Sequence, residues 1–355
     1  MVKKAQPFPE RSSQRKKPIR PFKPLPTVDP DYVDISYKPD DWSVAFGHVP
    51  VLPQEVVWNM DIKPSGFYVD LTMGGGGHSR YILSQLGQNG RLLALDKDSE
   101  PHLWAKLWGQ DDKRLITIKA GFEEIKSVLA DLKLGPVDAM LADLGLSSRQ
   151  LFSNGRGFSV QSIEPLDMRL DPTTKVTAFE IVNSWSEEEL VDLIRYRAEE
   201  RSGVQIAKRI VEKRTIKPIR TTGELADLAS EVLRRTGHRS RDINIATKLF
   251  MGFRLVVNQE VEALRTLLQV APSCLKPEGR LVVISFNSLE DRQVKRCFCS
   301  LEGQKIWDNL FKKPITPSKT ELASNRRARS AKMRVGRLKK VEKPKRRTEP
   351  SVKKT

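Results

Sequence analysis

The segment 70–79 combines an acidic residue, four consecutive glycines and the start of an amphipathic stretch. The glycines Gly74 to Gly77 let the backbone approach a ligand closely, and a helix that follows them presents free N–H groups. Such turns bind dinucleotides or S-adenosylmethionine. A carboxylate at Asp70 would repel a pyrophosphate but suit a methionine ammonium group, and no Gly-Lys-Ser/Thr follows the glycines. The segment therefore predicts an S-adenosylmethionine site, with a tight turn that holds no ligand as the alternative.

Further polar and aromatic positions could complete this chemistry. Asp96 ends the second apolar run, where it could accept hydrogen bonds from ribose hydroxyls. Phe122 could lie against an adenine ring, although core packing explains it equally well. Asp143 could accept the hydrogens of an exocyclic amine that attacks a methyl group, or it could cap the next helix. Ser147 and Ser148 follow as candidate contacts to the base edge or backbone.

Short apolar runs that alternate with amphipathic stretches would position these residues. Strands are predicted at 67–73, 91–96, 115–120 and 137–144, with helices between them. This alternation implies right-handed crossovers and a parallel sheet covered on both faces.

The alternation stops after the fourth strand. From about 151 to 269 the period is helical, with helices predicted at 187–197, 205–213, 222–236 and 245–268. A strand at 280–286 and a helix at 289–297 resume the first pattern, and two last strands are expected at 306–312 and 331–337. The middle block is therefore predicted to be a helical insertion in the α/β fold.

Positive charge is concentrated at the two ends of the chain. The formal net charge is +18, yet residues 1–28 hold 8 basic and 1 acidic side chains and residues 326–355 hold 14 and 2, so the body between 29 and 325 has a net charge of −1. Basic tails attract polyanions, which makes nucleic acid the expected partner. A solvated tail that aids solubility or targeting is the alternative.

Composition argues against several classes of protein. No apolar run approaches the roughly 18 residues of a membrane span. Three cysteines without a Cys-x-x-Cys pair and four scattered histidines give no support to a disulfide framework or a metal centre. We therefore expect no metal and a reducing compartment.

Several separate motifs together carry a specific resemblance. They occur, in order, at 48–52, 70–79, 141–151, 156–159, 165–169, 246–248, 285–292 and 325–334. The chain resembles the RsmH/MraW family of S-adenosylmethionine-dependent methyltransferases, which modify the N4 of a decoding-site cytosine in small-subunit ribosomal RNA. The resemblance extends from His48 to about Leu338.

The resemblance implies a class I methyltransferase, an α/β fold with a Rossmann-like, seven-stranded sheet and an inserted helical domain. The corresponding boundaries are 48–150 and 270–338 for the methyltransferase domain and 151–269 for the insertion, between a disordered basic extension at 1–47 and a basic tail at 339–355. It also implies cofactor contacts at Gly76, Gly77, His78, Asp96, Phe122, Asp143 and Gln150, beside Asp70 and Gly74 of the glycine segment. The acid-poor extension favours a mitochondrial member, against a cytoplasmic location if the protein is bacterial.

Two departures from the family pattern bear on activity. Asn287 and Asn244 stand where the family usually has histidine, and asparagine cannot take up a proton near neutral pH. Asn287 stays a candidate catalytic residue, and a catalytically weak subunit-assembly factor is the alternative function. Methylation of DNA or protein is disfavoured because the resemblance extends into the insertion.

The expected substrate is ribosomal RNA within an assembling subunit, with assembly proteins as further candidate partners. One unstacked cytosine of this RNA would enter the cofactor pocket. Basic residues are predicted to contact this RNA: Arg169, Arg292, Arg326, Arg327, Arg329 and Lys332.

Overall fold

The computed structural model describes residues 49–109, 111–147, 150–151, 155–236 and 245–340. The predicted extension at 1–47 and all but the first two residues of the tail at 339–355 lie outside the described residues. Their disorder therefore stays a prediction.

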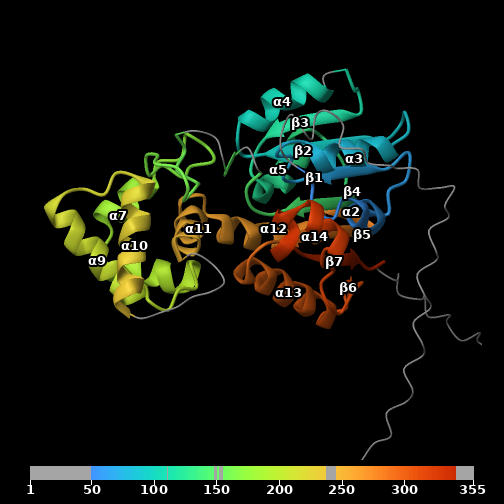
Figure 1. Cartoon of the computed structure of the whole chain (residues 1–355). Helices are drawn as coiled ribbons and strands as arrows, with labels where there is room; N and C mark the ends of the chain where they lie inside the picture. The colour runs from blue at the N-terminus through green and yellow to red at the C-terminus, as the bar shows by residue number, and fades with distance from the viewer. Residues whose placement is uncertain (1–48, 110, 148–149, 152–154, 237–244, 341–355) are drawn as a thin grey trace, which may run out of the picture. The chain divides into compact units, whose positions relative to one another are not determined.

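A seven-stranded sheet forms the centre of the α/β part (Figure 1). Its strands are β1 (Phe67–Asp70), β2 (Arg91–Asp96), β3 (Leu115–Lys119), β4 (Val137–Asp143), β5 (Leu275–Ser285), β6 (Trp307–Asn309) and β7 (Lys332–Leu338). The order is β3-β2-β1-β4-β5-β7-β6, with the first five strands parallel and β7 antiparallel to both of its neighbours. The predicted fold class is confirmed, including both strands expected near the end of the chain.

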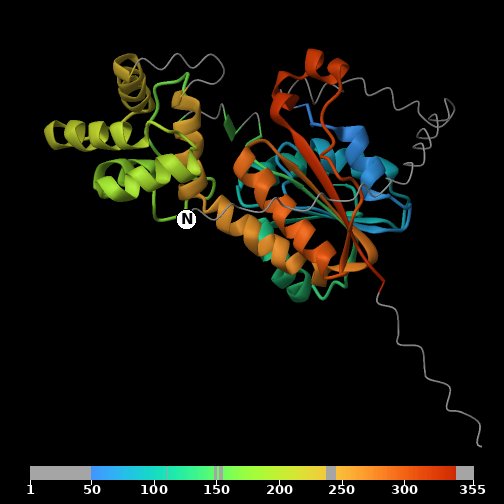
Figure 2. The same ribbon diagram turned by 90° about the horizontal axis from the view of Figure 1, so that it is seen from below.

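Helices cover the two faces of this sheet, because its strands are apolar on both sides. One face carries α2 (Pro53–Met60), α3 (Gly77–Gln85), α4 (Glu100–Gly109) and α14 (Lys319–Ser324), and the other carries α5 (Ile125–Asp131), α12 (Glu260–Cys274) and α13 (Ser288–Gly303). Tyr68 and Leu92 belong to the first core and their neighbours Val69 and Leu93 to the second, as the period of two requires. Figure 2 shows the strands between these two layers.

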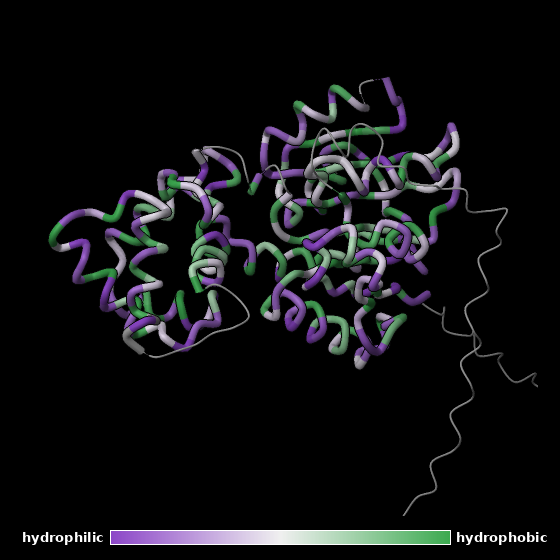
Figure 3. Tube along the Cα trace, in the orientation of Figure 1, coloured by the Kyte–Doolittle hydropathy of each residue, from purple (hydrophilic) through white to green (hydrophobic). Residues whose placement is uncertain are grey.

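The inserted block has a hydrophobic core of its own. Its helices are α7 (Ala178–Ser184), α8 (Glu187–Asp192), α9 (Gly203–Ile216), α10 (Thr222–Thr236) and α11 (Ile245–Val257), with a π-helical turn, η2 (Leu193–Arg197), after α8. Capping boxes at Thr177/Glu180 and Ser186/Glu189 begin α7 and α8. In Figure 3 the hydrophobic stretches of these helices alternate with hydrophilic ones, as expected of amphipathic elements.

The helix predicted at 245–268 is two helices. Gln259 adopts a left-handed backbone (φ 54°) between α11 and α12, which interrupts the helix. Leu264 and Leu268 of α12 then pack into the core of the sheet. The domain boundary predicted at 269 thus falls inside a helix that packs on the sheet.

Candidate active site

A cavity of about 460 Å³ opens where the parallel strands end. Open α/β sheets bind ligands at this edge, and the volume suits a small organic ligand. Residues from the loops after β1, β2, β3 and β4 line it, and so do four residues of one face of α11 and the turn after it: Thr247, Met251, Arg254 and Asn258. These four were not predicted, although their spacing of four, three and four positions is a helical-face signal.

The glycine segment forms the turn between β1 and α3. Gly74 and Gly77 line the cavity, as expected. Gly76 is different: it is buried with φ 81°, and a Cβ there would lie 2.4 Å from the ring of Trp108. It is not among the residues that line the cavity. Gly76 therefore shapes the turn by close packing, and the side-chain-free surface that faces the cavity comes from its neighbours.

Asp70 is held inside the protein at the end of β1. Its side chain is fully buried on the α3 face, where Oδ2 accepts a hydrogen bond from Ser79 Oγ at 2.6 Å and Oδ1 one from Thr72 N at 3.1 Å. Burial raises the pKa of this carboxyl. Asp70 is absent from the cavity lining, and its expected contact with a ligand ammonium group stays a prediction. The residue instead ties the glycine segment to α3.

Asp96 lines the cavity at the end of β2. Its Oδ2 accepts a hydrogen bond from Gly74 N at 2.8 Å and its Oδ1 one from Asp98 N at 2.9 Å. Burial raises the pKa of Asp96 to about 7. Each oxygen keeps a second lone pair, which suits hydroxyl donors such as those of a ribose. Phe122 also lines the cavity and packs against the sheet core, so its core packing is confirmed and its contact with an adenine ring stays a prediction.

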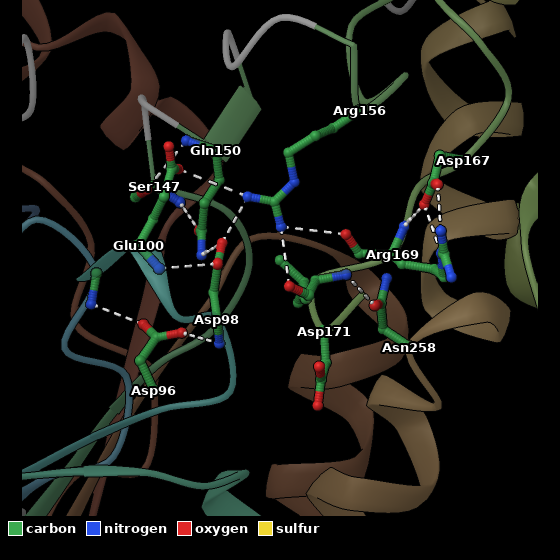
Figure 4. A network of polar contacts seen from close by, with 12 residues as sticks. Asp96, Asp98, Glu100, Ser147, Gln150, Arg156, Asp167, Arg169, Asp171 and Asn258 are labelled. Carbon is green, nitrogen blue, oxygen red and sulfur yellow. Dashed lines mark hydrogen bonds and ion pairs between the residues drawn. The ribbon is translucent and has the colours of Figure 1, made fainter. Parts of the chain in front are cut away.

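Behind Asp96, a polar network fixes the loop after β4 (Figure 4). Buried Gln150 accepts a hydrogen bond from Ser147 N through Oε1 at 2.9 Å and donates from Nε2 to Asp98 Oδ2 at 3.1 Å. Ser147 Oγ in turn accepts one from Gln150 N at 3.3 Å. Both side chains line the cavity, yet each is oriented by the other. Ser148 lies outside the described residues.

Arg156 extends this network into the inserted block (Figure 4). Its Nη1 donates to Asp98 Oδ2 at 2.7 Å, and its Nη2 donates to the carbonyls of Arg169 and Leu170 at 3.1 and 2.9 Å. Leu170 lines the cavity, and its N–H donates to Asn258 Oδ1 at 2.7 Å. Arg156 thus joins the wall formed by the sheet to the wall formed by the insertion. We did not predict this role, although the residue opens one of the motifs of the resemblance.

Asp143 ends β4 with its carboxylate in the cavity. Its N–H donates to Thr72 Oγ1 at 2.7 Å, and its Oδ2 lies 3.5 Å from Nδ1 of His78. The buried Oδ1 has no hydrogen-bond partner among the described residues. Burial raises the pKa of Asp143 to about 6, and nearby His78 opposes the shift. An acceptor oxygen therefore faces the space where a substrate amine would lie.

Asn287 has a structural role at the other side of the cavity. Its side chain caps α13 by accepting a hydrogen bond from Glu290 N at 2.9 Å, which asparagine does well. It also lines the cavity together with Glu290, whose pKa burial raises to about 7. The catalytic role of Asn287 stays a prediction. Asn244 lies outside the described residues.

Arg169, predicted to contact RNA, is engaged within the insertion. Its guanidinium makes two hydrogen bonds to Asp167, at 2.9 and 2.7 Å, and two more to the carbonyls of Pro172 and Thr174. These contacts make the segment around Arg169 a salt-bridged loop, so the structure does not support a phosphate contact by this residue.

The other predicted RNA residues are at the surface. Arg292 pairs with Glu199 at 2.7 Å and Lys332 with Asp291 at 3.6 Å, so RNA would have to compete with these ion pairs. The remaining three are exposed on the short helix η3 (Arg326–Ser330): Arg326, Arg327 and Arg329. Arg327 also lines the cavity.

The residues that line the cavity suit the predicted S-adenosylmethionine. Asp96 has free lone pairs for hydroxyls, Phe122 offers an apolar face, and Gly74 adds backbone without a side chain. Within the described ranges, no group of three His, Cys, Asp or Glu residues could hold a metal ion. In the same part of the chain, no helix is both long and apolar enough to cross a membrane.

Comparison with known proteins finds relatives that are similar over most of the chain. Two curated relatives are both called ribosomal RNA small subunit methyltransferase H. The one from Brevibacillus brevis is 39% identical over 321 residues, and the one from Caldicellulosiruptor saccharolyticus is 42% identical over 305 residues; each match covers 82% of this chain and 98% of the relative. A solved putative rRNA methylase from Clostridium thermocellum matches with a TM-score of 0.39 at 12% identity, covering 82% of this chain and 94% of that one. The model of the MraW methylase family matches residues 45–339. The chain therefore belongs to the MraW methylase family, which confirms the predicted methyltransferase and its S-adenosylmethionine cofactor.

Proposed function

We propose that this protein methylates the N4 of a cytosine in the decoding region of small-subunit ribosomal RNA. The names of the curated relatives support ribosomal RNA of the small subunit as the substrate. The observation that carries the chemistry is the buried Oδ1 of Asp143, which has no hydrogen-bond partner in the described part of the chain and lines the same cavity as Asp96 and the glycine segment.

The bound cofactor supplies an electrophilic methyl group, and the protein has to position and deprotonate the amine. The lone pair of a cytosine amine is delocalised into the ring, so the amine is a weak nucleophile. An N4–H···Oδ1 hydrogen bond to ionised Asp143 localises that lone pair. After the N4–methyl bond has formed, the same oxygen accepts the surplus proton. The Asp143 N–H bond to Thr72 and the contact with His78 keep the carboxylate in place.

The cytosine reaches this position only when it is unstacked from the RNA. Unstacking costs a few kcal/mol, which phosphate contacts along the basic surface would offset. Arg326, Arg327 and Arg329 form an exposed basic cluster on η3. This cluster lies at the mouth of the cavity because Arg327 also lines it.

Labelled methyl transfer to immature small subunits tests the proposal. Wild-type protein should incorporate label into N4-methylcytidine, and Asp143→Asn should lose incorporation while it still binds S-adenosylhomocysteine. Nucleoside mass spectrometry identifies the product. Persistence of N4-methylcytidine in cells that lack the protein would refute the activity.

The alternative function, assembly without catalysis, predicts tight binding to the subunit without incorporation. The helix-capping role of Asn287 favours the enzyme, because the asparagine has a structural reason to be there. A subunit-binding assay beside the methylation assay separates the two functions.

We further propose a mitochondrial location, on the basis of the basic, acid-poor composition of residues 1–28. A reporter fused to residues 1–47 should enter mitochondria, and its charge-reversed counterpart should not. A reporter that stays in the cytosol would refute this location.

A further inference from the structure

The ring of His78 is buried in the cavity wall between two acceptors. It is 5% exposed, and its Nε2 lies 2.8 Å from the carbonyl oxygen of Val51. A carbonyl only accepts hydrogen bonds, so Nε2 carries a hydrogen. The other nitrogen, Nδ1, lies 3.5 Å from Oδ2 of Asp143. The Val51 contact therefore leaves Nδ1 as the atom whose protonation state can change.

Nδ1 and Asp143 Oδ2 repel each other unless a proton lies between them. In a neutral ring with a hydrogen on Nε2, Nδ1 presents a lone pair, and two lone pairs repel when the carboxylate is ionised. One additional proton removes the repulsion, either as an imidazolium beside a carboxylate or as a neutral ring beside a carboxylic acid.

Charged groups from several elements surround the ring. Asp70 of β1 and Glu321 of α14 interact electrostatically with His78, and Asp143 of β4 faces it directly. Arg327 of η3 lines the same cavity and adds the opposite charge. Outside the pair itself, two carboxyl groups and one guanidinium therefore surround the ring.

We propose that His78 is a positioning residue that shares one proton with Asp143 and keeps Oδ1 as the acceptor during methyl transfer. This inference rests on the proposed function for the identity of the amine.

Methyl transfer brings one positive charge to N4, and the pair passes it on as a proton. The N4–methyl bond forms while the methyl–sulfur bond breaks and its electron pair stays on sulfur. The positively charged N4 then gives one proton to Oδ1 of Asp143. The pair now carries two protons, and one leaves from Nδ1 to water. The positive charge that entered with the sulfonium thus leaves as a proton.

Two substitutions of His78 test the two ring nitrogens separately. His78→Asn places an amide N–H near the position of Nδ1, which donates permanently to Asp143 but cannot release a proton. His78→Gln places its amide near the position of Nε2, which keeps the Val51 contact and leaves Oδ2 without its donor. The matched control is His102→Gln, because His102 Nε2 also contacts a backbone carbonyl, that of Asp96 at 3.0 Å, whereas no carboxylate is within ion-pair distance among the described residues.

We expect both His78 variants to bind S-adenosylhomocysteine and to lose about 100-fold in kcat. His78 lowers the pKa of Asp143, so the acidic limb of the kcat–pH profile should move to higher pH in His78→Gln. His102→Gln should keep the wild-type profile. An unchanged acidic limb in His78→Gln, or a loss carried only by KM, would overturn the proposal.

A second measurement needs no RNA. Binding calorimetry in two buffers of different ionisation enthalpy counts the protons that a ligand releases. S-adenosylmethionine, a cation, lowers the proton affinity of the pair without emptying it, so it should release a larger fraction of a proton from wild-type protein than neutral-sulfur S-adenosylhomocysteine does, and His78→Asn should reduce the difference. Equal release by both ligands from wild-type protein would refute the shared proton. Failure of the proposed function is distinct: wild-type protein would then transfer no methyl group to ribosomal RNA.

Discussion

Replacing Arg156 with alanine should destabilise the protein strongly, because this side chain joins the two walls of the cavity. The change removes one hydrogen bond to Asp98, at 2.7 Å, and two to the carbonyls of Arg169 and Leu170. Arg156 is 20% exposed and Asp98 is 3% exposed, so water replaces little of what is lost.

The magnitude follows from these contacts. Removing one member of a buried ion pair costs about 3 to 5 kcal/mol, and a hydrogen bond to a charged group contributes about 1.5 to 3 kcal/mol. Asp98 keeps two other donors, Gln150 Nε2 and Glu100 N, which reduces the loss. We expect the free energy of unfolding to fall by about 3 kcal/mol, or about 1 M in the urea midpoint at a slope of about 3 kcal/mol/M. Arg156→Lys should recover part of this, because one ammonium cannot reach all three acceptors.

Urea denaturation followed by circular dichroism measures the midpoint. Arg209→Ala is the control, because Arg209 also pairs with two carboxylates, those of Glu231 and Glu212, but at the surface. Its midpoint should barely change. A double-mutant cycle with Asp98→Asn should show a coupling of about 1 to 3 kcal/mol. Additive effects of the two changes, or a loss for Arg156→Ala no larger than that of Arg209→Ala, would refute the reasoning.

Three further outcomes are expected. Gly76→Ala should lower the free energy of unfolding by about 2 to 4 kcal/mol in urea denaturation, because its φ is 81° and the new Cβ would meet Trp108; Gly135→Ala, with no described atom within 4 Å of the new Cβ, should not. Burial raises the pKa of Glu290 to about 7, above its unfolded value of about 4.3, so the folded state binds more protons between these values and stability falls as pH rises through them. Glu290→Gln should flatten that fall, measured by denaturation at several pH values, and an equal fall in both proteins would contradict the assignment. Deleting residues 341–355 removes six basic side chains and should lower the salt dependence of RNA binding, d log K/d log[salt], by about 4 in filter-binding titrations; an unchanged slope would exclude the tail from RNA contact.

The sequence alone was enough for the sheet and for the strand ends that meet at the cavity. Local apolar periods mark the strands, and parallel strands necessarily bring their carboxyl ends to one edge. Asp96 and Asp143 were therefore placed at this edge from the sequence, because each ends a parallel strand, whereas the order of the strands came from the structure. The glycine turn was equally visible, since its conformation depends on adjacent residues.

Only the tertiary structure decided which side chains face the cavity and what orients them. Asp70 also ends a strand, but Ser79 of α3 holds its carboxylate inside the protein. Arg156 reaches Asp98 across 58 positions of the chain, and α11 brings residues of the insertion to the same cavity. Such contacts depend on how separately folded elements pack, and no local period in the sequence encodes that packing.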